Sequence, residues 1–190
     1  AGDVVMPNGN ASKRILLGTA GWERPDWRDA YYPADLPAEW RLAYYANDCD
    51  CLLLSAAEWC GGDRGQLGEA LAEAPNPPLL FLEPPAAARP ESCGELAMFA
   101  PHRVVLLMQR RDERFDRFPQ WVARGRDAWV DEGSSAMLQR WVVDAFDLRE
   151  LRGRVAGLPA DVSALILDGP GAQPGKIREL RLLLELMDRG

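Results

Sequence analysis

The chain has 190 residues, of which 47% are hydrophobic and 27% are charged, and its formal net charge is −7. This length and composition suit one globular domain with its own core and argue against a disordered chain. The negative charge argues against nucleic acid as a partner, because phosphate binding needs clustered Lys and Arg side chains.

Short apolar runs alternate with longer amphipathic runs, a pattern typical of parallel βα units. In chain order, the predicted strands are Arg14–Thr19, Cys51–Ala56, Leu79–Leu82, Arg103–Met108, Asp127–Asp131, Leu138–Ala145 and Ser163–Leu167. The predicted helices are Leu36–Ala46, Asp63–Ala74, Phe115–Arg124, Asp147–Ala156 and Gln173–Asp188. For residues 138–145 the pattern also allows a helix, and the spacing to the next helix favours a strand.

Right-handed crossovers between such strands give a mainly parallel sheet with the helices outside. The expected fold is therefore α/β and resembles a TIM barrel of about seven strands, although periodicity does not show whether the barrel closes. Residues 1–13 are expected to form a flexible lead-in, followed by a single domain over residues 14–190, because no repeat or interior linker divides the rest.

No apolar run approaches the roughly 18–20 residues of a membrane span, and the first thirteen residues lack the apolar core of a signal peptide. Four cysteines are too few for a disulfide framework, so a cytoplasmic location is expected. Cys49 and Cys51 would point to opposite faces of a strand, and the one histidine, His102, is far from them in sequence. We therefore expect no metal site and no cofactor.

The segment Gly18–Pro33 reads G-T-A-G-W-x-x-P-x-W-R-x-x-Y-Y-P, with many aromatic, glycine and proline positions close together. It resembles the opening of the YecE-like family, also called domain of unknown function family 72. Pro78–Pro85 and Leu165–Met187 resemble later segments of that family. The resemblance implies a barrel-like fold, and most members of the family have no assigned activity.

Where the family has an extra strand and helices, this chain has only Cys60–Pro77, so the resemblance implies a shortened or incomplete barrel. The polar residues that the family carries after its second strand are replaced by Leu53 and Ser55. Leu107 and Ala145 also stand where the family would place polar side chains. These departures imply that any pocket chemistry of the family is mostly lost.

Function in parallel α/β folds collects at the C-terminal ends of the strands. The residues expected to bind a ligand there are Thr19, Gly21, Trp22, Trp27, Tyr32, Ser55 and Trp59. Aromatic walls of this kind suit a sugar or a nucleobase. The alternative is that these aromatic side chains only pack the first loop onto the mouth of the barrel.

Carboxylates near the same strand ends are candidates for general acid–base catalysis, which needs one protonated and one ionised group. The candidate catalytic residues are Glu83, Asp131, Asp144 and Asp168. Carboxylates that end strands also serve as helix caps and surface charges, so this alternative stays open. Arg110 and Arg114 lie among Asp112, Glu113 and Asp116, and we interpret this run as a solvated face.

Two functional hypotheses follow. The first is a degenerate, non-catalytic domain that binds a small ligand or a protein partner, or that self-associates, since an incomplete barrel leaves strand edges to cover. The alternative is an enzyme with hydrolase-like acid–base chemistry in an aromatic- and carboxylate-lined pocket.

Overall fold

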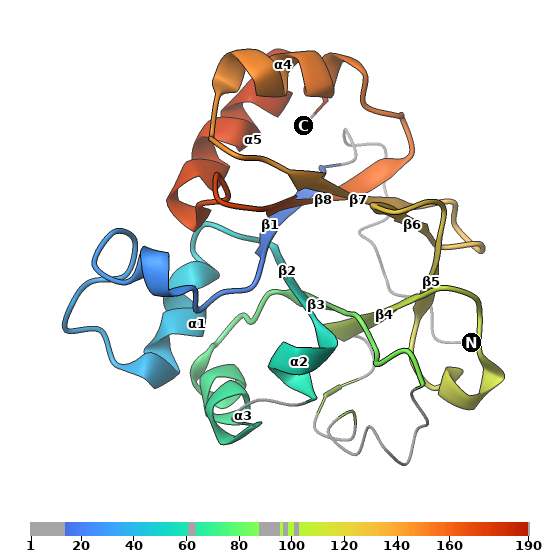
Figure 1. Cartoon of the computed structure of the whole chain (residues 1–190), viewed down its shortest axis with the longest axis horizontal. Coiled ribbons are helices and arrows are strands. Elements are labelled where there is room, and N and C mark those ends of the chain that lie inside the picture. The colour runs from blue at the N-terminus through green and yellow to red at the C-terminus, as the bar shows by residue number, and fades with distance from the viewer. Residues whose placement is uncertain (1–13, 61–63, 88–95, 97–98, 101–102, 190) are drawn as a thin grey trace.

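Eight strands close into a barrel in the computed structural model, which describes residues 14–60, 64–87, 96, 99–100 and 103–189 (Figure 1). The strands are β1 (Leu16–Ala20), β2 (Cys51–Leu54), β3 (Leu79–Leu82), β4 (Val104–Met108), β5 (Gln120–Ala123), β6 (Ala128–Val130), β7 (Met137–Val142) and β8 (Val162–Asp168). Each strand pairs with the next, and β8 pairs with β1. The expected α/β barrel is confirmed, but the prediction of about seven strands in an incomplete barrel is wrong.

All neighbouring strands are parallel except at β6, which runs antiparallel to both β5 and β7. The cause is the short connections on each side of β6, because a parallel crossover needs a dozen or more residues. The ends of β6 are therefore reversed relative to those of the other seven strands.

The additional strand is β5, which lies inside the predicted helix Phe115–Arg124. The structure places a single 3-10 turn, η6 (Glu113–Phe115), at the start of this segment and a strand at its end. Pro119 explains the difference, since proline inside a helix removes a backbone hydrogen bond and clashes with the preceding turn. Trp121 then points into the barrel, where its ring centroid lies 5.4 Å from that of Phe81.

The other predicted helices are present with shifted ends, and one short helix was not predicted. The helices are α1 (Arg41–Tyr45), α2 (Ala56–Trp59), α3 (Arg64–Glu73), α4 (Leu148–Ala156) and α5 (Ile177–Leu186). Single 3-10 turns, η2 (Ala38–Trp40) and η7 (Pro174–Lys176), precede α1 and α5. Asp63, the first residue of the predicted second helix, lies outside the described residues. None of the described helices is long and apolar enough to cross a membrane.

Two layers of apolar side chains build the core. The inner layer fills the barrel and includes Leu53, Phe81, Leu107, Trp129 and Ile166. The outer layer lies between the strands and the helices, which in Figure 1 gather around β1, β2, β3 and β8. The barrel is therefore a packed core rather than a pore, and only its two ends are open to polar chemistry.

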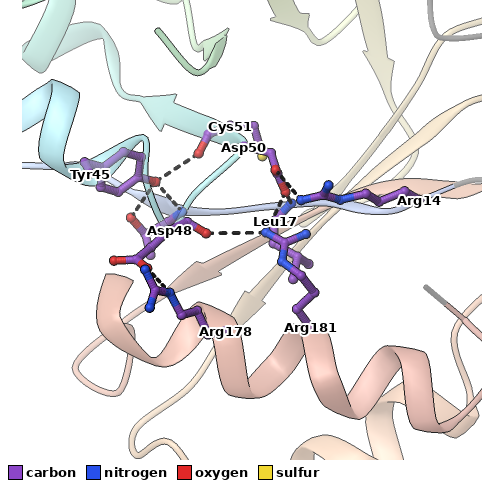
Figure 2. A network of polar contacts seen from close by, with 9 residues as sticks. Arg14, Leu17, Tyr45, Asp48, Asp50, Cys51, Arg178 and Arg181 are labelled. Atoms are coloured by element: carbon purple, nitrogen blue, oxygen red, sulfur yellow. Dashed lines mark hydrogen bonds and ion pairs between the residues drawn. The ribbon is translucent and has the colours of Figure 1, made fainter. Parts of the chain in front are cut away.

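A polar network at the N-terminal ends of β1 and β2 ties α5 to the barrel (Figure 2). The Asp50 carboxylate accepts hydrogen bonds from the Leu17 amide at 3.0 Å, from Arg14 at 3.0 Å and from Arg181 of α5 at 2.9 Å. Asp48 forms an ion pair with Arg178, also on α5, at 2.5 Å. The terminal helix is thus fixed to the first two strands by charge as well as by its apolar stripe.

Gly18 in β1 has no room for a side chain. A Cβ atom there would lie 1.9 Å from the carbonyl oxygen of Cys51 on the neighbouring strand. We predict that Gly18→Ala lowers the free energy of unfolding by at least about 2 kcal/mol, since the strands must move apart. For a chain of this size the melting temperature should fall by roughly 4–8 °C.

The matched control is Gly153→Ala in α4, where a Cβ atom would meet nothing within 4 Å. Alanine in an open helical position should stabilise by roughly 0.5–1 kcal/mol. Equal melting temperatures for the two variants would contradict the close approach of β1 to β2.

Asp50→Asn should destabilise the chain by about 1–3 kcal/mol at neutral pH, because the two arginines lose a charged, partly buried acceptor. Urea titration measures the loss. Asp161→Asn is the control, since the side chain of Asp161 is exposed and makes no hydrogen bond or ion pair within the described part of the chain. Similar urea midpoints for the two variants would show that the network is not stabilising.

Candidate functional site

A cavity of about 570 Å³ opens at the C-terminal ends of β2, β3 and β4. Its walls come from the start of α2, the segment after β3, the end of β4 and the turn η6. The lining residues are Ser55, Ala56, Ala57, Glu83, Pro84, Pro85, Ala86, Leu107, Met108, Gln109, Arg110, Asp112, Arg114, Phe115 and Trp129. This is the end of the barrel at which parallel α/β barrels place their sites, and the cavity is large enough for a small metabolite.

Glu83 is the half-buried carboxylate of this cavity. Pro84 and Pro85 end β3 because proline cannot continue a strand ladder. The backbone of Glu83 is nevertheless held on both sides: its amide donates to Leu54 O at 3.0 Å, and its carbonyl accepts from Trp59 Nε1 at 2.9 Å. The Glu83 side chain is therefore presented to the mouth from a fixed backbone.

Arg140 reaches the same mouth from β7. Its guanidinium lies 3.4 Å from the Glu83 carboxylate and 2.8 Å from that of Asp127, which directly precedes β6. The guanidinium also lies over the Trp129 ring, 5.4 Å from its centroid. Arg140 thus connects carboxylates from two separate loops and lies over the Trp129 ring.

The mouth carries more negative than positive charge around Glu83. Burial is the main cause that raises the pKa of the Glu83 carboxyl, and the neighbouring charges of Asp168, Glu58 and Asp127 raise it further. Arg140 acts in the opposite direction and lowers this pKa. A carboxyl group with a raised pKa in a cavity is a typical feature of a functional site.

At the rim, the segment from Arg110 to Arg114 adds charged side chains of both signs. Arg114 binds Asp112 through two side-chain nitrogens, and this hydrogen bonding holds the pKa of the Asp112 carboxyl below its usual range. Arg110 is exposed and makes no hydrogen bond or ion pair within the described residues. The cavity therefore has a negative inner end and, at its rim, an arginine without a hydrogen bond or ion pair in the described part of the chain.

Ser55 alone among the predicted ligand-binding residues lines this cavity. Trp27, Tyr32 and Trp59 are each at most 2% exposed, within the core. Trp27 Nε1 donates to Ala172 O at 3.1 Å, and the Tyr32 hydroxyl donates to Trp22 O. This burial matches the alternative stated above, in which the aromatic side chains pack the first loop onto the barrel.

The remaining predicted ligand-binding residues also lie away from the mouth cavity. The buried Thr19 hydroxyl donates to Gly21 O at 2.9 Å. Gly21 has a φ of 75°, a left-handed conformation that favours glycine, and a Cβ there would lie 2.9 Å from Glu58 Oε1. Trp22 borders a separate hollow of about 350 Å³.

The predicted catalytic carboxylates separate in space. Asp168 is close enough to Glu83 to raise its pKa, but its own Oδ1 accepts the Gly169 amide at 2.7 Å. Asp131 caps the turn after β6 by accepting from Ser134 Oγ at 2.5 Å. Because β6 is antiparallel, this turn lies at the opposite end of the barrel, and the prediction that Asp131 shares the C-terminal edge is wrong. Asp144 is exposed outside the cavity.

Sequence reasoning missed Arg140, Asp127 and Trp129. Arg140 follows Leu138 by two residues, and Leu138 belongs to the inner layer, so the alternation of β7 points both side chains into the barrel. Asp127 became part of the mouth through the reversal of β6, for which no sequence signal was recognised.

Nucleophiles and metal ligands are not gathered in the described part of the chain. Burial raises the pKa values of the Cys49 and Cys51 thiols well above their usual range, so both stay protonated. Among the described residues, no cluster of three or more His, Cys, Asp or Glu side chains could hold a metal ion. His102 lies outside those residues.

The pKa of Glu83 offers a direct test of this electrostatic arrangement. Arg140→Gln should raise this pKa further above its usual value, because the main opposing charge is removed. Carbon-detected NMR titration of labelled glutamate carboxyls measures it, with Glu83→Gln identifying the resonance. An unchanged or lower pKa in the variant would contradict the ion pair.

The sign of the accompanying stability change follows from linkage. Between the pKa of Glu83 in the unfolded chain and its raised pKa in the folded chain, the folded chain binds more protons at Glu83. The contribution of this group to the unfolding free energy therefore falls as pH rises through that range. The Glu83→Gln variant should lack that decline.

One comparison with known proteins, a match to a family model, agrees with the resemblance found in the sequence. Residues 16–55, from β1 to the residue after β2, match the model of a family described as "Protein of unknown function DUF72". A crystal structure of a DUF72 family protein from Thermotoga maritima aligns over 91% of this chain and 98% of that chain, with 11% sequence identity and a TM-score of 0.49. No curated protein matches the chain. The predicted resemblance to the DUF72 family is thus confirmed over residues 16–55.

Proposed function

We propose that this chain is a non-catalytic domain that binds a small polar ligand in the cavity at the C-terminal mouth of the barrel. The observation that carries the proposal is the cavity itself, in which a half-buried carboxylate, Glu83, faces a space of about 570 Å³. Pro84, Leu107 and Trp129 supply apolar surface beside it. A mostly apolar concavity with a few convergent polar groups is typical of small-molecule sites.

The enzyme alternative finds less support in this geometry. Burial raises the pKa of Glu83, as suits a general acid, but the Asp127 carboxylate is paired with Arg140, and the Asp168 carboxylate accepts the neighbouring Gly169 amide. The Ser55 hydroxyl lies 2.8 Å from Glu58 Oε2, in contact with the capping carboxylate of α2 rather than with a base aimed at the cavity. One carboxyl with a raised pKa, without a second carboxylate shown to act as its partner, supports binding more than acid–base turnover.

The closed barrel also removes the reason to expect self-association through strand edges. The hypothesis required unpaired strand edges, and the eight strands of the described chain close on themselves. A site within the barrel mouth, rather than a strand edge, is then the feature that a partner molecule would use.

Ala57→Trp should abolish binding by filling the cavity from α2, while the exposed position of Ala57 keeps the change in stability small. The probes are glucose, citrate, putrescine and glutamine, one for each charge class. Two-dimensional amide NMR spectra should show shifts at the cavity residues of the unmodified chain with at least one probe.

Ala156→Trp is the matched control, because Ala156 is an exposed helical alanine that does not line this cavity. It should bind as the unmodified chain does. Absence of shifts with all four probes, or binding that survives in Ala57→Trp, would overturn the proposed function.

A further inference from the structure

The charges that line the cavity are separated into two poles. The inner pole is built around Glu83, with the charges of Asp168, Glu58 and Asp127 close enough to affect it and the charge of Arg140 opposing them. These four carboxylates and one guanidinium leave the inner end with an excess of negative charge. A hydrogen-bond donor with a positive charge is the group that such an end favours.

The outer pole lies on the segment that follows β4. Arg110 and Arg114 both line the cavity there, together with Asp112. Asp112 is engaged by Arg114 at 2.6 Å, so that pair is close to neutral. Arg110 remains an exposed guanidinium with no hydrogen bond or ion pair to the described residues, although its charge contributes to lowering the pKa of Asp112.

The two poles suit opposite ends of one ligand. Arg110 has the planar fork of donors that carboxylate and phosphate groups bind. Within the described residues its guanidinium makes no hydrogen bond or ion pair, even though the whole chain is negative at −7. An anion bound at the inner end would instead meet Glu83 and its neighbouring carboxylates, so the order of the charges in the cavity also sets the direction of the ligand.

We propose that the cavity selects amphoteric small molecules, in which an amine binds at Glu83 and a phosphate or carboxylate binds at Arg110. This inference rests on the proposed function and names the ligand class of the same site. Pro84 and Phe115 provide the apolar surface between the two poles. A purely anionic or purely cationic ligand has a group of complementary charge for only one of the two poles.

Four sugars that differ only in these two groups test the inference: glucose, glucosamine, glucose 6-phosphate and glucosamine 6-phosphate. Titration calorimetry or NMR titration gives the affinity of each. Glucosamine 6-phosphate should bind most tightly, and each charged group should contribute about tenfold in affinity.

Two variants assign the poles. Glu83→Gln should remove the preference for the amino group and keep the preference for phosphate, and Arg110→Gln should do the reverse. Arg111→Gln is the control, because Arg111 is exposed, pairs with Asp116 and does not line the cavity. It should leave all four affinities unchanged. Because Glu83 is half-buried, circular dichroism and the melting temperature confirm that each variant is folded.

The outcomes separate this inference from the proposed function. Glucosamine 6-phosphate that fails to bind, or that binds no better than glucose 6-phosphate or glucosamine, overturns the amphoteric ligand class. Loss of both preferences in either variant also overturns it. If glucose, citrate, putrescine or glutamine still binds in a manner that Ala57→Trp abolishes, the proposed function survives that result. If glucosamine 6-phosphate does not bind and glucose, citrate, putrescine and glutamine do not bind either, both proposals fail.

Discussion

The pairing of β1 with β8 is the constraint on which the rest of the structure depends. Leu16 to Thr19 pair with Ala164 to Leu167, and this contact joins the two ends of the described chain into a closed ring. Closure brings Asp168, at the end of β8, to the same mouth as Glu83, which follows β3. The electrostatic character of the site is therefore a consequence of closure, since no local segment contains it.

Arg140 has a double role at that mouth. Its positive charge compensates the negative charges of Glu83 and Asp127, and its guanidinium lies over the Trp129 ring. Removing an arginine from such a place would leave carboxylates close together in a partly buried setting, which is costly in free energy. Arg140 therefore reduces the repulsion between these carboxylates, while the carboxylates around it leave the inner end of the cavity with an excess of negative charge.

Strands with strong apolar runs were predictable from the sequence, and the short elements near residues 113–130 were not. Leu79–Leu82 has the predicted bounds because Pro84 and Pro85 mark its end clearly. Gln120–Ala123 lies inside the predicted helix Phe115–Arg124, where Phe115, Phe118 and Trp121 have helical spacing but Pro119 disfavours a helix. Propensity patterns of four residues rarely decide between the two.

The site was predictable only in part, for a geometric reason. Glu83 was found because it ends a strand that was correctly assigned, and its position in a parallel sheet follows from that assignment. Asp127 and Asp131 flank the same strand, and the reversal of β6 exchanges which of them faces the mouth. Strand direction is a tertiary property here, and neither residue's own neighbourhood in sequence reveals it.

The uneven spacing of contacts along the chain has a consequence for how the barrel forms. The β5–β6 and β6–β7 pairings join residues close in sequence, whereas β1 and β8 meet across nearly the whole chain. Local pairings form early and distant ones late, because loop-closure entropy opposes the latter. The hairpins of β5, β6 and β7 should therefore be early structure, and β1 and β8 should be the edges that stay open longest. Until they meet, both strands offer unpaired backbone to other chains, so aggregation during refolding is expected to begin there.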